Sequence, residues 1–181
     1  DLGTTTTTGT YQVTATAGGD ITDSGTLTIG GAATFTAAGG KNIYLDNKDS
    51  SNVLFGIHTF SGAVTFASGG TLANVTVRNS GAFDFGAALT LATGGNLILT
   101  AGGTVTQTGG ALVIPGTTTI LSSGSNVTLS NASNDFTGAV SITGNTVTLV
   151  DANAIDLGAS TVTGNYAVTA TAGGGITDSG V

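Results

Sequence analysis

The chain lacks several residue types that most folds use. Its 181 residues include no cysteine, methionine or tryptophan, one proline, and no glutamate, because all ten acidic residues are aspartate. Glutamate, methionine, lysine and arginine are strong helix formers, whereas threonine, valine, glycine, asparagine and aspartate favour strands and turns. The chain is built from the second group, and we therefore expect no helix. A chain without cysteine is compatible with a cytoplasmic or an exterior location.

Basic residues are also scarce. Three lysines and arginines against ten aspartates give a net charge of −7, which excludes a nucleic-acid binder because that class needs a clustered basic face. No apolar run is long enough to span a membrane, and no signal segment opens the chain. With 39% hydrophobic and 7% charged residues, the chain has the composition of a folded domain rather than of a disordered one.

What the chain does have is internal repetition. Residues 1–25 match residues 156–180 at 19 of 25 positions, an offset of 155, and residues 84–109 form a weaker third copy. A period of this size is typical of repeat architectures. We therefore predict one β-solenoid covering residues 1–181, with repeat units 1–83, 84–155 and a partial unit 156–181. We also expect it to be a segment of a longer array, since it lacks an initiating methionine and stops inside a repeat.

Short apolar-Thr-apolar triplets recur along the chain, bounded by glycine, asparagine or aspartate. Strict alternation places both apolar side chains on one face and the threonine on the other. The pattern predicts strands of three to five residues separated by short turns. The triplets lie at 13–15, 27–29, 64–66, 75–77, 89–91, 127–129 and 147–149.

The spacing of these strands predicts an all-β, right-handed parallel β-helix (β-solenoid) of about seven coils, each of roughly 22 residues and three short strands. In this register the second unit stacks in three columns, and its middle coil is about six residues longer near 130–134. Unit one carries a longer insertion between Asp46 and Phe60, either one excursion or two short coils. The alternative fold is a pair of bacterial immunoglobulin-like sandwiches. The columns are Leu89, Leu112, Val140 and Val162; Leu97, Thr118, Val147 and Val168; and Val105, Val127, Ile155 and Ile176.

The excursion over residues 46–60 is one candidate binding site, because loops that project from rigid scaffolds commonly carry recognition. The alternative is an ordinary insertion whose apolar residues pack on the neighbouring coil. It gathers charged and apolar residues outside the regular pattern: Lys48, Asp49, Val53, Leu54, Phe55, Ile57 and His58, with Lys41 just before it.

Acidic residues in turns are candidates for calcium binding or for glycoside cleavage. Aspartates and asparagines are paired at Asp46–Asn47, Asn134–Asp135 and Asp151 with Asn153, but the calcium-binding β-roll repeat is absent. Such residues also satisfy backbone donors in turns without a metal. Glycoside cleavage needs two carboxylates, which Asp84 and Asp156 would supply. Each of them opens a repeat unit, as Asp1 does, which indicates a turn role instead. We therefore predict no enzyme, no catalytic residue, no metal site and no cofactor.

Outward threonines are the last candidates. Thr90, Thr128, Thr148 and Thr169 are placed to form flat ranks like those of β-helical ice-binding proteins. Threonine is also a favoured exposed strand residue, and these single threonines are spread over three faces. Ice binding therefore stays a minor alternative.

The triplets with Gly-Gly turns, and the phrases NDFTGAV at 134–140 and DANAIDLG at 151–158, resemble repeats of giant filamentous-haemagglutinin-like bacterial exoproteins. This resemblance, to adhesins of the two-partner-secretion type, covers essentially the whole chain. It implies a secreted or cell-surface stalk segment without catalysis, which presents or mediates contact between cells or with surfaces. The implied partners are neighbouring repeats of the same chain and a host cell surface, partner cell surface or glycan. The alternative function is a carbohydrate- or surface-binding module acting through residues 46–60.

Overall fold

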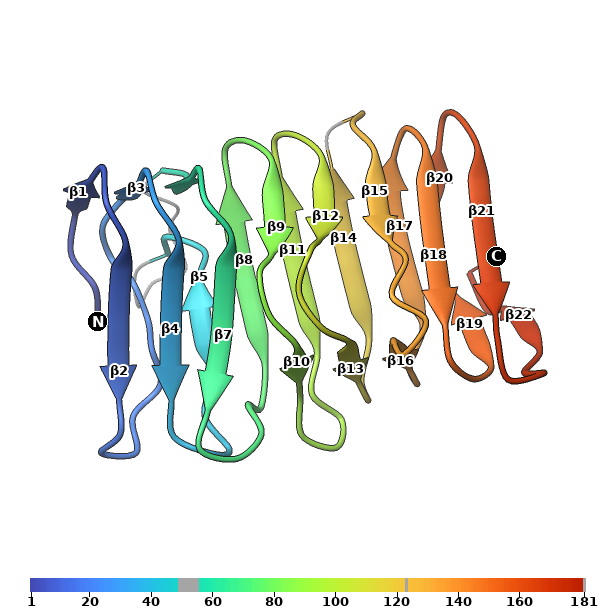
Figure 1. The fold of residues 1–181 in the computed structure, drawn as a ribbon, viewed down its shortest axis with the longest axis horizontal. Coiled ribbons are helices and arrows are strands. Elements are labelled where there is room, and N and C mark those ends of the chain that lie inside the picture. Colours follow the sequence, from blue (N-terminus) through green and yellow to red (C-terminus); the bar gives the residue numbers. More distant parts are fainter. Residues whose placement is uncertain (49–55, 123, 181) are drawn as a thin grey trace.

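The protein is an all-β solenoid of about eight turns, in which parallel strands stack along one axis (Figure 1). The computed structural model describes residues 1–48, 56–122 and 124–180. In Figure 1 the chain descends through a near sheet, rises through a far sheet and advances from left to right, so the winding is right-handed. The predicted fold class is confirmed, with about eight coils instead of seven, and the immunoglobulin-like alternative is wrong.

Two large sheets form the walls of the solenoid, and we name them by their position in Figure 1. The near sheet contains, in spatial order, β2 (Tyr11–Ala15), β4 (Ala33–Ala37), β7 (Val64–Ser68), β9 (Phe83–Phe85), β12 (Val105–Gln107), β15 (Val127–Leu129), β18 (Val147–Asp151) and β21 (Tyr166–Ala170). The far sheet contains β5 (Ile43–Leu45), β8 (Val75–Asn79), β11 (Leu97–Ala101), β14 (Thr118–Ser122), β17 (Val140–Gly144), β19 (Ile155–Leu157) and β22 (Ile176–Asp178), with β20 (Thr161–Val162) also paired to β17.

Two small sheets close opposite edges of the solenoid. The upper one in Figure 1 contains β1 (Thr5–Thr7), β3 (Leu27–Ile29) and β6 (Thr59–Phe60). The lower one contains β10 (Leu89–Thr90), β13 (Leu112–Ile114) and β16 (Asp135–Phe136). The short strands thus change edges where the first unit gives way to the second.

This change of edge reflects a half-turn offset between the two units. Strands at equivalent sequence positions lie in opposite large sheets: β4 is near whereas β14 is far, and β5 is far whereas β15 is near. Between β2 and β21, which begin the matching segments YQVTA and YAVTA, the near sheet gains seven strands. Two units therefore make seven turns and restore the original orientation, which explains why the strongest sequence match joins the first unit to the third and not to the second.

The predicted strand register is right in part and wrong in part, because the sequence analysis did not include the half-turn offset. The expected pairs Leu89–Leu112, Leu97–Thr118, Val105–Val127 and Ile155–Ile176 are all present. Beyond residue 130 the predicted columns are wrong. Thr118 pairs with Val140 instead of Val147, and Val127 pairs with Val147 instead of Ile155. Leu112 and Val140 lie in different sheets, and Val168 pairs with Leu149.

No coil is six residues longer near 130–134, since Thr118 pairs with Val140 at the regular coil spacing. The prediction assumed three strands in every coil, but the chain passes from β18 in the near sheet directly to β19 in the far sheet without a small-sheet strand between them. Three strands per coil is therefore not a constant of this fold.

The insertion in unit one is confirmed as a single long coil. Thr5 pairs with Leu27 at the regular coil spacing, whereas Thr28 pairs with Thr59 across a clearly longer step. Ile43 then pairs with Val75 in the next far-sheet strand, β8. The extra residues therefore lie between β5 and β6 in the sequence.

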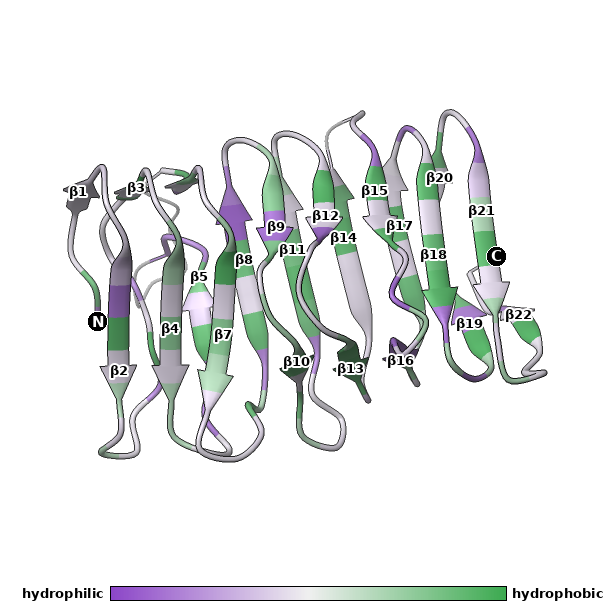
Figure 2. Ribbon diagram, in the orientation of Figure 1, coloured by the Kyte–Doolittle hydropathy of each residue, from purple (hydrophilic) through white to green (hydrophobic). Residues whose placement is uncertain are grey.

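The core is a continuous apolar column between the two large sheets. Strand residues alternate between buried and outward positions, as in Leu27–Ile29 and Val127–Leu129, which confirms the triplet pattern. Figure 2 shows this alternation as bands along the strands. Aromatic rings stack from coil to coil, with Phe66 6.3 Å from Phe35 and 6.4 Å from Phe83 between ring centroids. Each fully buried side chain of this kind contributes roughly 1.5–3 kcal/mol.

Candidate functional site

The base of the excursion holds a buried polar cluster. His58 and Asp23 both have fully buried side chains, with His58 Nε2 3.1 Å from Asp23 Oδ2. The backbone N–H of Leu27 donates to His58 Nδ1 over 3.1 Å. Because Nδ1 is an acceptor, the neutral imidazole carries its proton on Nε2, facing Asp23. The Nε2–H bond is not aligned for a hydrogen bond, so His58 Nε2 and Asp23 Oδ2 lie in close contact without one.

This tautomer argues against metal ligation at the cluster. A metal ion needs the lone pair of Nε2, which would move the proton to Nδ1, against the N–H of Leu27. Among residues 1–48, 56–122 and 124–180, no three histidine or acidic side chains gather as a metal-binding group. The contacts within the chain therefore account for the position of His58.

Asn47 connects the excursion to the same cluster. It adopts a left-handed backbone conformation with a φ of 52°, which asparagine tolerates better than most residues. Its N–H donates to Asp23 Oδ1 over 3.3 Å, and its side-chain amide donates to Thr26 Oγ1 over 3.2 Å. Outside the cluster, Lys48 pairs with Asp46 at 3.5 Å on the surface. The predicted residues Asp49, Val53, Leu54 and Phe55 lie outside the described residues.

The second unit repeats the cluster with different side chains. There, Asn134 Oδ1 accepts the N–H of Leu112 over 2.9 Å, and its amide exchanges two hydrogen bonds with Gln107. Asn134 thus corresponds to His58, and Gln107 to Asp23. The two clusters have the same arrangement, although one contains an acid and an imidazole and the other two amides. The arrangement therefore serves packing between coils and does not depend on a titratable pair.

The turn residues singled out for calcium also bind backbone groups. Asp151 is buried, and its two carboxylate oxygens accept the N–H groups of Phe136 at 2.7 Å and Asn153 at 2.6 Å. Asn79 does the same for the N–H of Phe60 over 2.8 Å. Asx residues here complete strand ends, which accounts for their presence without a cation.

The aspartates that open each unit hold the following coil. Asp84 accepts hydrogen bonds from the hydroxyl of Thr106 at 2.9 Å and from Thr108. In the same way Asp156 accepts from Thr177 and Ser179, and Asp1 from Ser24. Asp84 and Asp156 lie within strands β9 and β19, so the predicted turn role is wrong for both, and they bind the next coil from a strand instead.

A polar ladder along the far sheet was missed from the sequence. Asn42 donates from its backbone and side chain to Asp20, Asn74 donates to Asn42 Oδ1 over 2.9 Å, and Asn96 donates to Asn74. Asn96 in turn accepts from the N–H and hydroxyl of Thr117, both over 2.8 Å. The available signal was an Asn or Thr directly before the far-sheet strands β5, β8, β11 and β14.

The backbone N–H of Asn42 holds the pKa of Asp20 below its usual value, against the opposing effect of partial burial. The acid end of the ladder therefore favours its ionised form in the folded state.

The four outward threonines do not form one rank. Thr128 and Thr148 are register partners in the near sheet, whereas Thr90 pairs with Val113 in the lower sheet and Thr169 with Val150. The exposed face of the near sheet therefore carries a short threonine row rather than an extended lattice of them.

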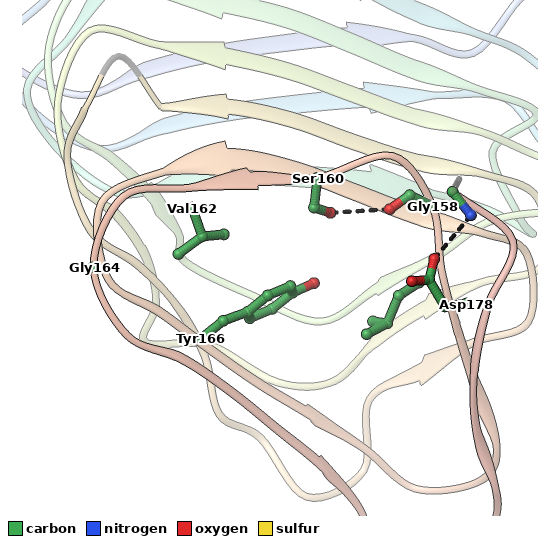
Figure 3. A pocket seen from close by; sticks show the side chains of 8 residues that line it. Gly158, Ser160, Val162, Gly164, Tyr166 and Asp178 are labelled. Atoms are coloured by element: carbon green, nitrogen blue, oxygen red, sulfur yellow. Dashed lines mark hydrogen bonds between the residues drawn. The ribbon is translucent and has the colours of Figure 1, made fainter.

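Two cavities are lined entirely by described residues. One, of about 270 Å³, lies between β7 and β10. The other, of about 380 Å³, lies in the last coil between Leu157, Ser160, Tyr166 and Asp178 (Figure 3). This second cavity is the open interior of the coil.

Comparison with protein families gives a match over nearly the whole chain. A family model described as repeats of unknown function (DUF5649) matches residues 1–67, 72–143 and 144–181. Searches of the curated proteins and of the solved structures found no match. Over the part of the chain that the structure describes, no helix is long and apolar enough to cross a membrane.

Proposed function

The chain belongs to the family of repeats of unknown function (DUF5649), and from this premise we propose that it is a structural stalk segment without catalysis. In this proposal the solenoid is part of a very large secreted or cell-surface bacterial adhesin. Its repeats hold or present the parts that contact other cells or surfaces.

One observation carries the structural role. The polar side chains that were candidates for chemistry bind the neighbouring coil: His58 binds Leu27, Asp151 binds Phe136, and Asp84 binds Thr106. Side chains committed to coil-to-coil hydrogen bonds are not available for a substrate. They rigidify a rod, which at about 4.8 Å per coil is on the order of 35–40 Å long.

The adhesin context rests on the resemblance in the repeat phrases and is supported by composition. A chain without cysteine can cross membranes unfolded and then fold outside without forming disulfides. Low charge and threonine-rich outer faces suit an exposed fibre that does not bind indiscriminately.

Two measurements test this function. The purified protein is applied to bacterial cells, mammalian cells and a glycan panel, and we expect no saturable binding. One, two or three copies are then placed beneath a characterised adhesive tip on a displayed fusion, and we expect the reach of the tip to increase with copy number. Saturable binding by a single copy, or reach that does not depend on copy number, would contradict the stalk.

The excursion supports a second candidate, a carbohydrate- or surface-binding module acting through residues 46–60. The specific observation is that both ends of the insertion are anchored, through Asn47 and His58, to the buried carboxylate of Asp23. A loop fixed this firmly at its base is well suited to recognition. Replacing 49–55 by a Gly-Ser segment of equal length should abolish glycan binding under this alternative and leave it absent under the stalk proposal.

A further inference from the structure

The coil at residues 156–180 repeats the coil at 1–25 but is not covered in the same way. The inward residues are identical at four paired positions: Leu2 and Leu157, Tyr11 and Tyr166, Ile21 and Ile176, and Asp23 and Asp178. Ile21 is 2% exposed, whereas Ile176 is 51% exposed. The difference arises because the next coil stacks on the first of these two coils.

The uncovered face is hollow and partly polar. Figure 3 shows Tyr166 pointing into the 380 Å³ cavity, with Val162 on one side of its ring, Asp178 on the other and Ser160 across from it. The Tyr166 hydroxyl is buried and has no hydrogen-bond partner among the described residues. The face therefore offers an apolar floor and two polar groups, and the counterpart of Asp178 in the first coil, Asp23, is engaged by the following coil.

In the first coil, residues 26–60 supply that engagement. Tyr11 pairs with Ala33, and its ring lies 6.1 Å from that of Phe35. The N–H of Ile21 donates to the carbonyl of Asn42 over 3.0 Å. Asp23 receives Asn47 and His58, as described above.

The large sheets also end at this face. β21 is the last strand of the near sheet and β22 the last of the far sheet, so each presents an edge to which a parallel strand can add. A coil placed here continues an interface that the first two coils already make.

We propose that the face of residues 156–180 binds a coil of the 26–60 type, supplied by a further repeat of this family. The strands of this added coil extend both large sheets, and its equivalents of Leu27 and Phe35 fill the cavity. Its equivalents of Asn47 and His58 contact Asp178 as Asn47 and His58 contact Asp23. This inference builds on the stalk proposal, because it names the partner through which the rod is lengthened.

The test joins a second copy of residues 26–180 directly after Gly180. We expect exchange of the Ile176 amide hydrogen to slow by at least about tenfold relative to the single chain. We also expect the second histidine to show the same Nε2-protonated tautomer as His58 in ¹⁵N spectra. A matched control joins a Gly-Ser segment of equal length instead, which does not form coil strands and should give no such protection.

A substitution at Asp178 tests whether the added coil makes the specific contacts of the first two coils or only lies nearby. Asp178→Ala should leave the thermal midpoint of the single chain unchanged, since Asp178 is exposed there, and should lower that of the fused chain, as Asp23→Ala does in both. Unchanged Ile176 exchange in the fused chain, equal protection by the control, or a neutral Asp178→Ala in both chains would overturn the proposal. None of these readouts involves cells, so the stalk function can fail independently.

Discussion

The side-chain amide of Asn74 donates to Asn42 Oδ1 over 2.9 Å, although the two residues are separated by the whole excursion. This bond joins the coils on either side of the insertion. The polar ladder is therefore continuous across the insertion, because Asn74 binds Asn42 just as Asn96 binds Asn74 one regular coil later.

Removing the centre of this ladder should be costly. Asn74→Ala takes away the donor to Asn42 and leaves the N–H and amide of Asn96 without their acceptor. We expect a loss of about 1–3 kcal/mol in the free energy of unfolding, measured by urea denaturation. Asn153→Ala, at an exposed turn, is the control and should change the free energy by less than about 0.5 kcal/mol. Equal effects would argue against the ladder.

The cluster beneath the excursion should accept the side chains of its counterpart. Asp23→Ala removes the acceptor of the Asn47 N–H and the partner of His58, and we expect a loss of about 1–3 kcal/mol because buried donors are left without an acceptor. The double variant Asp23→Gln with His58→Asn reproduces Gln107 and Asn134 and should recover most of that loss. A double variant as unstable as Asp23→Ala would show that the two clusters are not equivalent.

Two equivalent glycines are required by close backbone approach. A Cβ on Gly109 would collide with the backbone of Ala87, as one on Gly25 would with the backbone of Thr4. Gly109→Ala should therefore cost about 1–3 kcal/mol in thermal or urea unfolding. Gly81→Ala is the control, because no atom lies within 4 Å of the added methyl group. A Gly109 variant as stable as the control would contradict the close stacking.

Acid should weaken the ladder at Asp20. Its folded pKa is lowered from 3.8 by the N–H of Asn42, so the ionised carboxylate stabilises the fold above pH 3.8 and this contribution is lost as the pH falls through the lower folded value. The difference in thermal midpoint between the protein and Asp20→Asn should be largest near neutral pH and vanish in strong acid. The group is mostly exposed, so the difference is small. A difference that stays constant with pH would contradict this assignment.

The local sequence pattern predicted the strands and the fold class, but it did not predict which strands pair between coils. The alternation in Leu27–Ile29 and Val127–Leu129 is local, so strands, inward faces and the approximate coil length could be predicted. Pairing Thr118 with Val140 depends on which edge carries the short strand, and no single strand encodes that edge. The pattern therefore predicted the class correctly and the later register wrongly.

The candidate sites follow the same division. The equivalence of Asp84 and Asp156 could be predicted because each opens a repeat unit, but the predicted turn role was wrong, since both lie within strands. The contact of His58 with Asp23 could not, since a full coil and the insertion separate them and their counterparts in unit two are different residue types.

Register is the most direct test of the account, and the absence of cysteine makes it accessible to disulfide trapping. The structure pairs Thr119 with Ser141 across β14 and β17, at a separation that a disulfide can bridge. Oxidising Thr119→Cys with Ser141→Cys should give nearly complete cross-linking, whereas Thr119→Cys with Thr148→Cys should give none. Cross-linking of the second pair in place of the first would contradict the half-turn offset between units, and with it the stacked rod proposed here.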